Sequence, residues 1–539
     1  DLIVIVGQNP GTNHPRMLSA LEEAKRRGAK IVAVNPLPEA GLMRFKNPQK
    51  VKGVAGRGTR LADLFLPVRV NGDLALFAGV NKELLEREES GTSVLDKDFV
   101  DRYTDGFAET AAAWRALPWA DIEERSGLSR AQIAEFADDV VASKAVVVCW
   151  AMGLTQHKNA VPTIREVMNF LLLRGNIGRP GAGPCPVRGH SNVQGDRTMG
   201  IFEQMPDSFL DALRDEFRFE PPREHGWDTV GSIRAMRDGK VDVFIGLGGN
   251  FAAAAPDTAV TAAALSRCAL TVHIATKLNR SHLEHGNEAL ILPCLGRTER
   301  DLNEAGEPQF VTVEDSMSVV HASQGRLVPG SPGQRSEVAI LSGLARETFG
   351  DDIGWGEMGS DYSVIRAHIA NVVPGFADFE ARVSDPGGFT LPRPPRDARR
   401  FDTPSGRALF TVNGVSAVAV PEGHLLLQTI RSHDQFNTTV YGLNDRYRGV
   451  HGGRRVVLVS PDDLASLGFA NEDVVDLVSV WSDGERRAPG FRIVEYPTPA
   501  GCAAAYFPET NVLIPLDSVA DVSNTPTSKS IVVRLERLS

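Results

Sequence analysis

The chain has 539 residues, of which 42% are hydrophobic and 23% are charged, and its formal net charge is −10. This length predicts about three or four domains with cores of their own, and the composition gives no sign of disorder or of a membrane-spanning class. The negative balance argues against a general nucleic-acid binder, which needs a basic face.

The first 36 residues predict a βαβ unit. Leu2–Val6 is a continuous apolar run that ends at Gly7, as in a strand buried on both faces of a parallel sheet. A polar loop leads to an amphipathic helix over 16–27, with Gly28 as its C-cap, and then to a second apolar strand over 31–36. A buried strand at residue 1 is an abrupt beginning, so we expect another segment to precede it.

The same pattern continues along the chain. Buried strands are expected over 145–150, 241–250, 269–276 and 289–296, and an alanine-rich helix follows the second of them. We therefore expect two doubly wound nucleotide-binding α/β domains, in residues 1–190 and 191–348.

The class of structure changes towards the carboxyl end. Residues 349–420 are proline-rich and poorly periodic, which predicts a connecting segment. Residues 421–539 alternate short β-branched strands with turns, which predicts a compact domain like a β-barrel.

Two turns run from a strand through glycine into a helix, where backbone amides and the helix dipole favour a phosphate. The first contains Gly7, Asn9 and Asn13, and the second contains Gly246, Gly249 and Asn250. Neither is a G-x-G-x-x-G motif, and ordinary turns capped by asparagine fit each of them equally well. Together they indicate one ligand with two dinucleotide arms, or two nucleotides.

The loop over 185–200 is crowded with glycine and polar side chains. Arg188 is followed by His190 and Gln194, and an arginine held there suits a carboxylate or oxyanion. An exposed Ω-loop is the plain alternative. His157 reads as a loop histidine and Cys149 as a core residue. The five cysteines have no spacing that suits zinc or an iron–sulfur cluster, which favours a reducing compartment and a cytoplasmic location.

Taken in order, several segments resemble the large subunit of molybdopterin oxidoreductases that carry molybdenum bis(molybdopterin guanine dinucleotide). Within that family the likeness is to formate-dehydrogenase-like alpha subunits. The segments that carry it are 1–15, 24–36, 150–195, 289–301, 429–449 and 525–530.

The resemblance implies a role for each matching residue. One guanine dinucleotide would be held by Gly7, Asn9, Asn13, Asn35, Gly153 and Gln156, and the other by Gly246, Gly249, Asn250, Lys277 and Ser281. His190 and Gln194 would line the cofactor, and Arg188 would bind the carboxylate of the substrate beside the metal. The last domain would cover the pterins with Arg431, Ser432, Gln435, Asn511 and Lys529.

The family also implies parts that this chain does not contain. Its iron–sulfur cysteines and its metal-ligating residue precede the first strand, so a 4Fe-4S cluster is expected only in such a segment, and no metal ligand is assigned. The expected reaction is the oxidation of formate to carbon dioxide, with an electron-acceptor protein of unknown identity. The alternatives are reduction of another oxyanion such as nitrate, a cofactor-binding fragment without catalysis, and unrelated nucleotide-binding domains.

Overall fold

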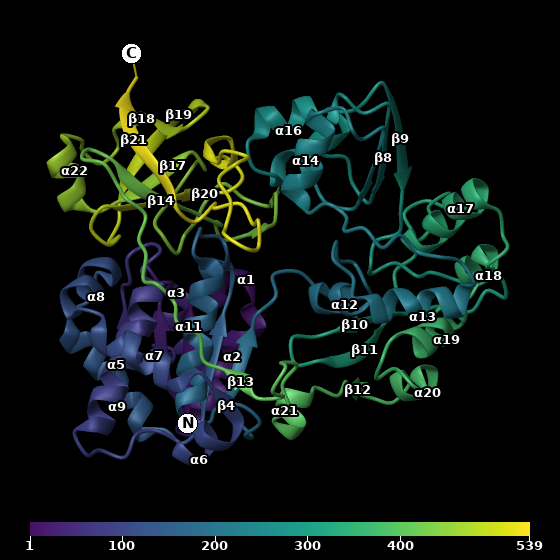
Figure 1. The fold of residues 1–539 in the computed structure, drawn as a ribbon. Helices are drawn as coiled ribbons and strands as arrows, with labels where there is room; N and C mark the ends of the chain where they lie inside the picture. Colours follow the sequence, from purple (N-terminus) through teal and green to yellow (C-terminus); the bar gives the residue numbers. More distant parts are fainter. Residues whose placement is uncertain (539) are drawn as a thin grey trace. The chain divides into compact units, whose positions relative to one another are not determined.

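The computed structural model describes residues 1–538, apart from the side chain of residue 52 (Figure 1). It divides into two compact units. The first contains Asp1–Val187 together with Arg393–Ser539, and the second contains Arg188–Pro392. The units therefore do not follow four consecutive domains, because the chain leaves the first unit at residue 187 and returns to it at residue 393.

A parallel five-stranded sheet forms the centre of the first unit. Its order is β3-β2-β1-β5-β6, with bounds Leu64–Leu66, Lys30–Val34, Leu2–Val6, Val146–Trp150 and Gly183–Pro186. Val4 pairs with Val32 on one side and with Val148 on the other, and all three are buried. The strands expected from the apolar runs near residues 2, 31 and 146 are confirmed, as is the doubly wound order around β1.

Helices of the first unit supply the rest of its core. Phe77 of α5 and Phe170 of α11 pack edge to face, with their ring centroids 5.6 Å apart. The helices before residue 188 are α1 Pro10–Asn13, α2 Pro15–Arg26, α3 Ala40–Met43, α4 Val51–Ala55, α5 Asp73–Glu89, α6 Lys97–Tyr103, α7 Phe107–Ala116, α8 Trp119–Ser126, α9 Arg130–Ala142, α10 Met152–Thr155 and α11 Ala160–Leu173.

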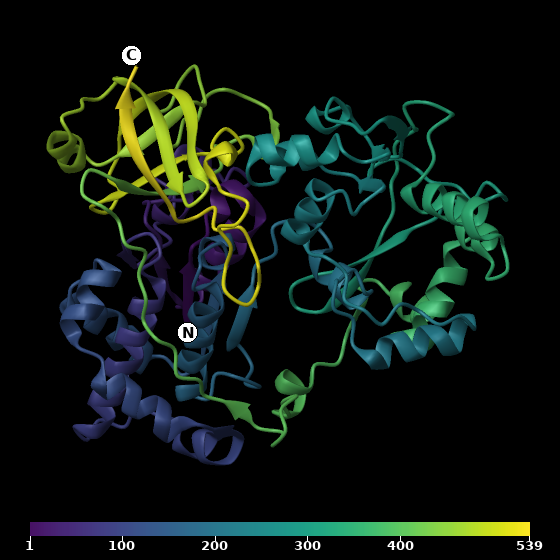
Figure 2. The same ribbon diagram turned by 45° about the horizontal axis from the view of Figure 1, so that its top comes forward.

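The carboxyl-terminal part of the first unit is a closed barrel (Figure 2). Its strands run in the order β14 Leu425–Ile430, β20 Cys502–Tyr506, β17 Val456–Val459, β19 Gly484–Glu495, β18 Val474–Trp481 and β21 Ile531–Arg537. Inward side chains such as Leu427, Leu477 and Phe491 fill it. The predicted barrel is therefore confirmed. Around it lie the hairpin β15 Gln435–Phe436 and β16 Thr439–Val440, the helix α22 Pro461–Leu467 and the 3-10 turn η2 Asn511–Leu513.

The barrel and the α/β layer of the first unit are in direct contact. Leu37, which follows β2, is buried in one cluster with Val450, Leu458 and Tyr506. Further along, β13 Ala408–Leu409 pairs in parallel with β4 Thr104–Asp105, after the short helix α21 Pro394–Ala398. The loops that leave the sheet next to Leu37 therefore face the barrel.

The second unit has its own parallel sheet, β7 Val243–Leu247, β8 Leu270–Ala275 and β9 Glu288–Pro293, in chain order. The outer strands β7 and β9 expose apolar side chains such as Ile245 and Leu290, whereas the apolar side chains of β1 are mostly buried. An antiparallel sheet of β10 Val311–Glu314, β11 Val319–Ser323 and β12 Phe389–Thr390 completes the strands of this unit in the part of the chain described. Its short helices before residue 300 are α12 Val193–Thr198, α13 Asp207–Phe217, α14 Thr229–Arg237, α15 Phe251–Ala254, α16 Thr258–Leu265 and the 3-10 turn η1 Arg280–His282.

Much of the expected connecting segment 349–420 is ordered structure of the second unit. It contains α18 Trp355–Ser360, α19 Tyr362–Val372 and α20 Phe379–Val383, which follow α17 Glu337–Phe349. Phe376, Phe379 and Leu391 form part of a buried cluster there. These scattered aromatic and aliphatic residues pack together without a regular period in the sequence. No helix within residues 1–538 is long and apolar enough to cross a membrane.

Candidate functional site

The strand order of the first unit reverses between β1 and β5, and the loops after these strands diverge there. Such a switch point is where open α/β sheets bind ligands. The two loops touch: Gly153 N donates to Gly7 O at 3.1 Å. A Cβ on Gly153 would lie 2.4 Å from Gly7 Cα, and Gly7 has φ of +56°. Both glycines are therefore required by the close approach of the loops.

The turn after β1 is fixed by its asparagines. Asn9 Oδ1 accepts from Thr12 N at 3.2 Å, and Asn9 Nδ2 donates to Glu39 Oε2 at 2.6 Å. Asn35 is buried and donates from Nδ2 to Gln8 O at 3.0 Å. Asn35 thus holds the backbone of the turn. Asn13 ends α1 and is exposed.

A cavity of about 760 Å³ opens beside this turn, entirely within the first unit. Its wall includes Asn9, Thr12 and Glu39 from the α/β layer and His433 and Arg448 from the barrel side. Its size lies in the range of small-molecule sites. Further lining residues carry positive charge, namely Arg16, Arg44, Lys46 and Arg446. The cavity therefore suits a ligand that carries phosphate.

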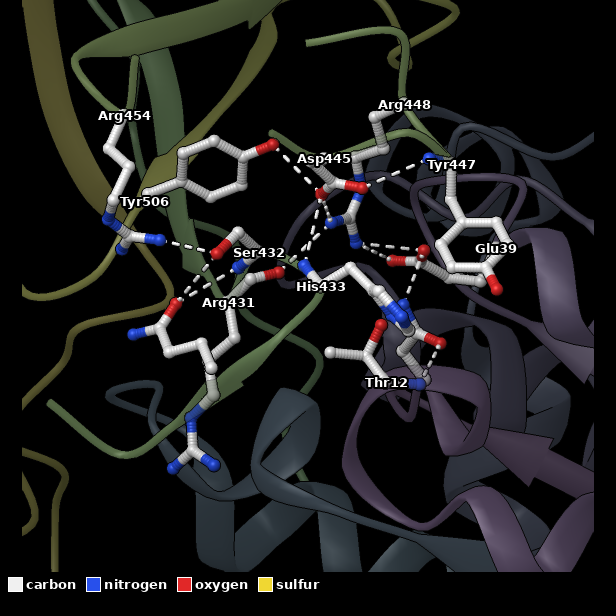
Figure 3. Close-up of polar contacts among 12 residues, drawn as sticks. Thr12, Glu39, Arg431, Ser432, His433, Asp445, Tyr447, Arg448, Arg454 and Tyr506 are labelled. Atoms are coloured by element: carbon white, nitrogen blue, oxygen red, sulfur yellow. Dashed lines mark hydrogen bonds and ion pairs between the residues drawn. The ribbon is translucent and has the colours of Figure 1, made fainter. Parts of the chain in front are cut away.

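A buried ion network joins the barrel side to this cavity (Figure 3). Arg448 Nη2 donates to both carboxylate oxygens of Glu39 at 2.8 Å, and Arg448 Nη1 donates to Asp445 Oδ2 at 2.8 Å. Tyr506 Oη donates to the same oxygen of Asp445 at 2.9 Å. The side chains of Arg448, Glu39 and Asp445 are 4%, 7% and 1% exposed. Although burial works to lower it, the two carboxylates raise the pKa of Arg448, so the guanidinium stays charged.

Two more cations lie near the end of β14: Arg431 follows the strand directly, and Lys529, which precedes β21, contacts Thr429 within it. Burial lowers the pKa of Lys529 to about 7, and the charges of Arg431 and Arg448 act in the same direction. Burial also lowers the pKa of Arg431. The Lys529 ammonium donates to Thr429 O, whereas the Arg431 guanidinium makes no hydrogen bond or ion pair within residues 1–538 and points away from the Arg448 network (Figure 3). Two poorly compensated cations favour the binding of an anion.

The loop after β5 meets the segment around Lys529. Ser528 Oγ donates to Gln156 Oε1 at 2.8 Å, and Lys529 N donates to Gln156 O at 3.1 Å. The structure therefore brings Gly7, Gly153, Gln156 and Lys529 into one contiguous region, although their sequence positions span the whole first unit.

Three predicted residues of the barrel side are buried. Gln435 Oε1 accepts from Ser432 N at 3.0 Å, and Gln435 Nε2 donates to Phe507 O at 2.8 Å. Ser432 Oγ accepts from Arg454, and Asn511 opens η2 with 1% of its surface exposed. Ser432 and Gln435 thus hold the loop that presents Arg431.

His157, which the sequence indicates is an ordinary loop residue, is buried against the loop after β5. Its Nε2 lies 2.6 Å from Gly153 O, which makes Nε2 the protonated nitrogen, and burial lowers its pKa to about 4. The neutral ring leaves a buried Nδ1 with no partner in the described chain. The same is true of three other atoms around the site, Gln8 Oε1, His433 Nδ1 and Arg448 Nε. Glu39, His433 and Arg448 were not predicted as site residues, because no local pattern distinguishes them.

The remaining predicted residues lie in the second unit. Arg188 donates from Nη2 to Gln194 Oε1 at 2.9 Å and from Nε to the same oxygen at 3.3 Å, so Gln194 orients the guanidinium. His190 is exposed. In the part of the chain described, no group of three or more His, Cys, Asp or Glu side chains is arranged to hold a metal ion.

The glycine turn after β7, also in the second unit, begins two residues later than the sequence predicts. Gly246 lies inside β7, and the turn itself begins at Gly248. Asn279 Nδ2 donates to Gly249 O at 2.7 Å, and Ser281 Oγ donates to Asn250 Oδ1 at 3.3 Å. Gly249, Asn250 and Ser281 are therefore neighbours, and Lys277 is exposed on the same loop.

Comparison with known proteins places this geometry in context. The chain matches the family models Molybdopterin oxidoreductase, over residues 1–309, and Molydopterin dinucleotide binding domain, over residues 425–532. It is 60% identical to an uncharacterised oxidoreductase of Mycobacterium tuberculosis, with 99% of this chain and 70% of that protein covered. It is 43% identical to protein YdeP of Escherichia coli, with 99% and 72% covered.

Two further likenesses are more distant. Formate dehydrogenase H of Escherichia coli is 30% identical over 209 residues, which are 39% of this chain and 26% of that protein. The solved structure of acetylene hydratase from Pelobacter acetylenicus superposes with a TM-score of 0.70 over 100% of this chain and 78% of that one, at 15% identity. At that identity the likeness concerns the fold alone.

Proposed function

The chain belongs to the molybdopterin oxidoreductase family. We propose that it is the catalytic subunit of an enzyme that oxidises formate to carbon dioxide. The observation that carries the choice of substrate is Arg188, whose guanidinium is oriented by Gln194. The partial identity with formate dehydrogenase H, which includes no more than 39% of this chain, supports the same choice.

The residues present fit a molybdopterin dinucleotide. The cavity beside the β1 turn has the volume of a nucleotide-sized ligand and a wall of cations, which suits a pyrophosphate. The buried atoms without partners, His157 Nδ1 and Gln8 Oε1 among them, are polar groups that a bound ligand satisfies. We propose the guanine form, with Asn9 and Thr12 near one nucleotide and Lys529 and Arg431 near the pterins.

The second nucleotide would be held by the turn of the second unit. Gly249 has φ of +72° and a backbone open to close approach, and Asn250 and Ser281 are already hydrogen-bonded to each other. Lys277 adds an exposed positive charge. We propose a 4Fe-4S cluster only for residues outside this chain, to be tested by iron and sulfide analysis of the complete enzyme.

Formate oxidation releases two electrons and one proton together with carbon dioxide. When bound, the molybdenum cofactor supplies the acceptor for the two electrons. Arg188 binds the formate carboxylate through two parallel N–H groups, which fixes its orientation. His190 and Gln194 form the adjacent wall, and Gln194 keeps the guanidinium from rotating. The physiological electron acceptor would be a separate protein.

The test uses the complete enzyme loaded with cofactor. Formate-driven dye reduction and nitrate-driven dye oxidation are measured side by side for the wild type, Arg188→Ala and Arg188→Lys. Loss of charge-assisted hydrogen bonds worth about 1.5–3 kcal/mol each predicts that Arg188→Ala lowers kcat/KM for formate at least tenfold, with partial recovery in Arg188→Lys. Unchanged kcat and KM for formate would remove Arg188 from the site, and turnover with nitrate alone would favour the reductase alternative. Bound dinucleotide with neither turnover would favour a cofactor-binding fragment.

A further inference from the structure

Two cysteines face each other on neighbouring strands of the first unit. Cys149 lies on β5 and Cys185 on β6, and they are register partners in the parallel pairing of these strands. Register partners in a parallel pair point to the same face of the sheet. Both side chains belong to the apolar cluster around Ile5 and Leu18 on that face.

The separation suits a covalent bond between them. Neighbouring strands lie about 4.8 Å apart, and the Cα atoms of disulfides lie about 4.4–6.8 Å apart. Interaction with Cys185, together with burial, raises the pKa of Cys149, as expected for two neighbouring thiols. Cys149 is buried, whereas Cys185 is partly exposed and is the thiol that an oxidant reaches first.

The strand that carries Cys185 is suited to small movements. β6 is the last strand in the sheet order, and its four residues include Pro184 and Pro186, which have no N–H to donate. Shortening the distance between the two Cβ atoms to the value of about 3.8 Å that a disulfide needs therefore requires the shift of a weakly tethered edge strand. A bond formed under such strain is more easily reduced.

We propose that Cys149 and Cys185 form a reversible disulfide when the protein meets hydrogen peroxide. The Cys185 thiolate attacks one peroxide oxygen, which gives a sulfenic acid and releases the other oxygen as water after protonation. The Cys149 thiol then attacks the Cys185 sulfur, so that the S–S bond forms and a second water leaves. One peroxide is reduced and two thiols are oxidised, and a small dithiol restores them.

The other three cysteines provide internal controls. Cys268, Cys294 and Cys502 are buried in separate parts of the chain, after α16, after β9 and on β20. In the described residues Cys502 pairs with Leu426 and Cys294 with Arg335, and no strand register brings any of these three to another cysteine. Peroxide at moderate concentration should therefore modify only the pair on β5 and β6.

The experiment treats the complete enzyme with hydrogen peroxide and maps its peptides by mass spectrometry before and after dithiothreitol. The expected product joins the peptides of Cys149 and Cys185 and disappears on reduction, in the wild type and in the matched control Cys502→Ser. In Cys149→Ser, Cys185 should accumulate as a sulfenic acid that dimedone traps and then as a sulfinic acid. Direct conversion of Cys185 to the sulfinic acid in the wild type, or no modification of either cysteine, would overturn the proposal. The wild-type measurement decides even where a variant fails to fold.

Discussion

Arg448 should contribute more to the attachment of the barrel than any exposed ion pair. It donates to Glu39, which follows β2 of the α/β layer, and to Asp445 beside the barrel, and all three side chains are at most 7% exposed. We consider the substitution Arg448→Met, which keeps most of the side-chain volume and removes the charge. Glu39 and Asp445 are then left as two buried carboxylates that share no cation.

The magnitude follows from the cost of a buried charge without its partner. Removing one member of a buried pair costs about 3–5 kcal/mol, whereas Asn9 and Tyr506 still donate to the two carboxylates and limit the loss. We therefore expect a loss of about 4 kcal/mol. This is roughly a thousandfold in the equilibrium for separating the barrel from the layer, since each 1.4 kcal/mol is about tenfold.

Hydrogen exchange measures that equilibrium better than a global unfolding midpoint, because a chain with two compact units need not unfold in one step. The amides of β14 and β17 should exchange about a thousandfold faster in Arg448→Met. The matched control is Arg102→Met, which breaks an exposed pair with Asp98 whose side chains are 63% and 70% exposed and should change stability by at most about 0.5 kcal/mol.

A double-mutant cycle isolates the pair itself. Glu39→Gln alone leaves Arg448 with only Asp445 as a charged partner, and the double variant should cost less than the sum of the single ones, by about 1–3 kcal/mol. Additive effects, or a loss below about 1 kcal/mol in Arg448→Met, would refute the view that this network fastens the barrel to the α/β layer.

Three titratable groups of the first unit have a pKa shifted by burial, and each gives a prediction that is checked by the thermal midpoint of that unit as a function of pH. Burial raises the pKa of Asp73 to about 7, so the stability that the protonated carboxyl contributes is complete below pH about 3.9 and is lost as pH rises through 7. Asp73→Asn should therefore raise the thermal midpoint more at pH 8 than at pH 4, and equal changes at the two pH values would contradict this. Burial lowers the pKa of His157 to about 4, so the protein loses stability as pH falls from about 6.5 through 4. His157→Gln should reduce the fall of the thermal midpoint over this pH range, and an unchanged fall would count against a buried neutral imidazole. Burial lowers the pKa of Lys529 to about 7, so protonation of its amine costs stability as pH falls from about 10.4 through 7. Lys529→Met should raise the thermal midpoint more at pH 6 than at pH 10, and the reverse order would refute the lowered pKa.

The parts of the fold that the sequence predicts are those with a strong local pattern. β1, β2 and β5 are apolar runs buried on both faces, and the barrel strands alternate with turns, so each is visible in its own residues. The pairing of Ala408 with Thr104 has no such signal. It returns the chain to the first unit across about three hundred residues, and only packing determines it.

The site divides in the same way. Gly7, Asn9 and Gln156 lie where strands end, which topology alone marks as a ligand position. Arg448 and Glu39 are 409 positions apart, and in sequence the first sits among other polar residues of an ordinary loop. Their importance comes from burial and from each other. An interaction that depends on two distant residues becoming buried together leaves no periodicity in either neighbourhood.

The two groups of cations around the site are treated differently by the fold, and the difference has a physical reason. Arg448 is surrounded by carboxylates that raise its pKa, so its charge is compensated within the protein and it serves attachment. Arg431 and Lys529 are desolvated without a carboxylate in direct contact, and burial lowers the pKa of both. Burying a cation without a charged partner costs free energy, and such a cost is typical of sites where a bound ligand compensates the charge. An anion between Arg431 and Lys529 would restore the pKa of each towards its ordinary value, so the binding of an anion there would be coupled to the stability of the barrel side.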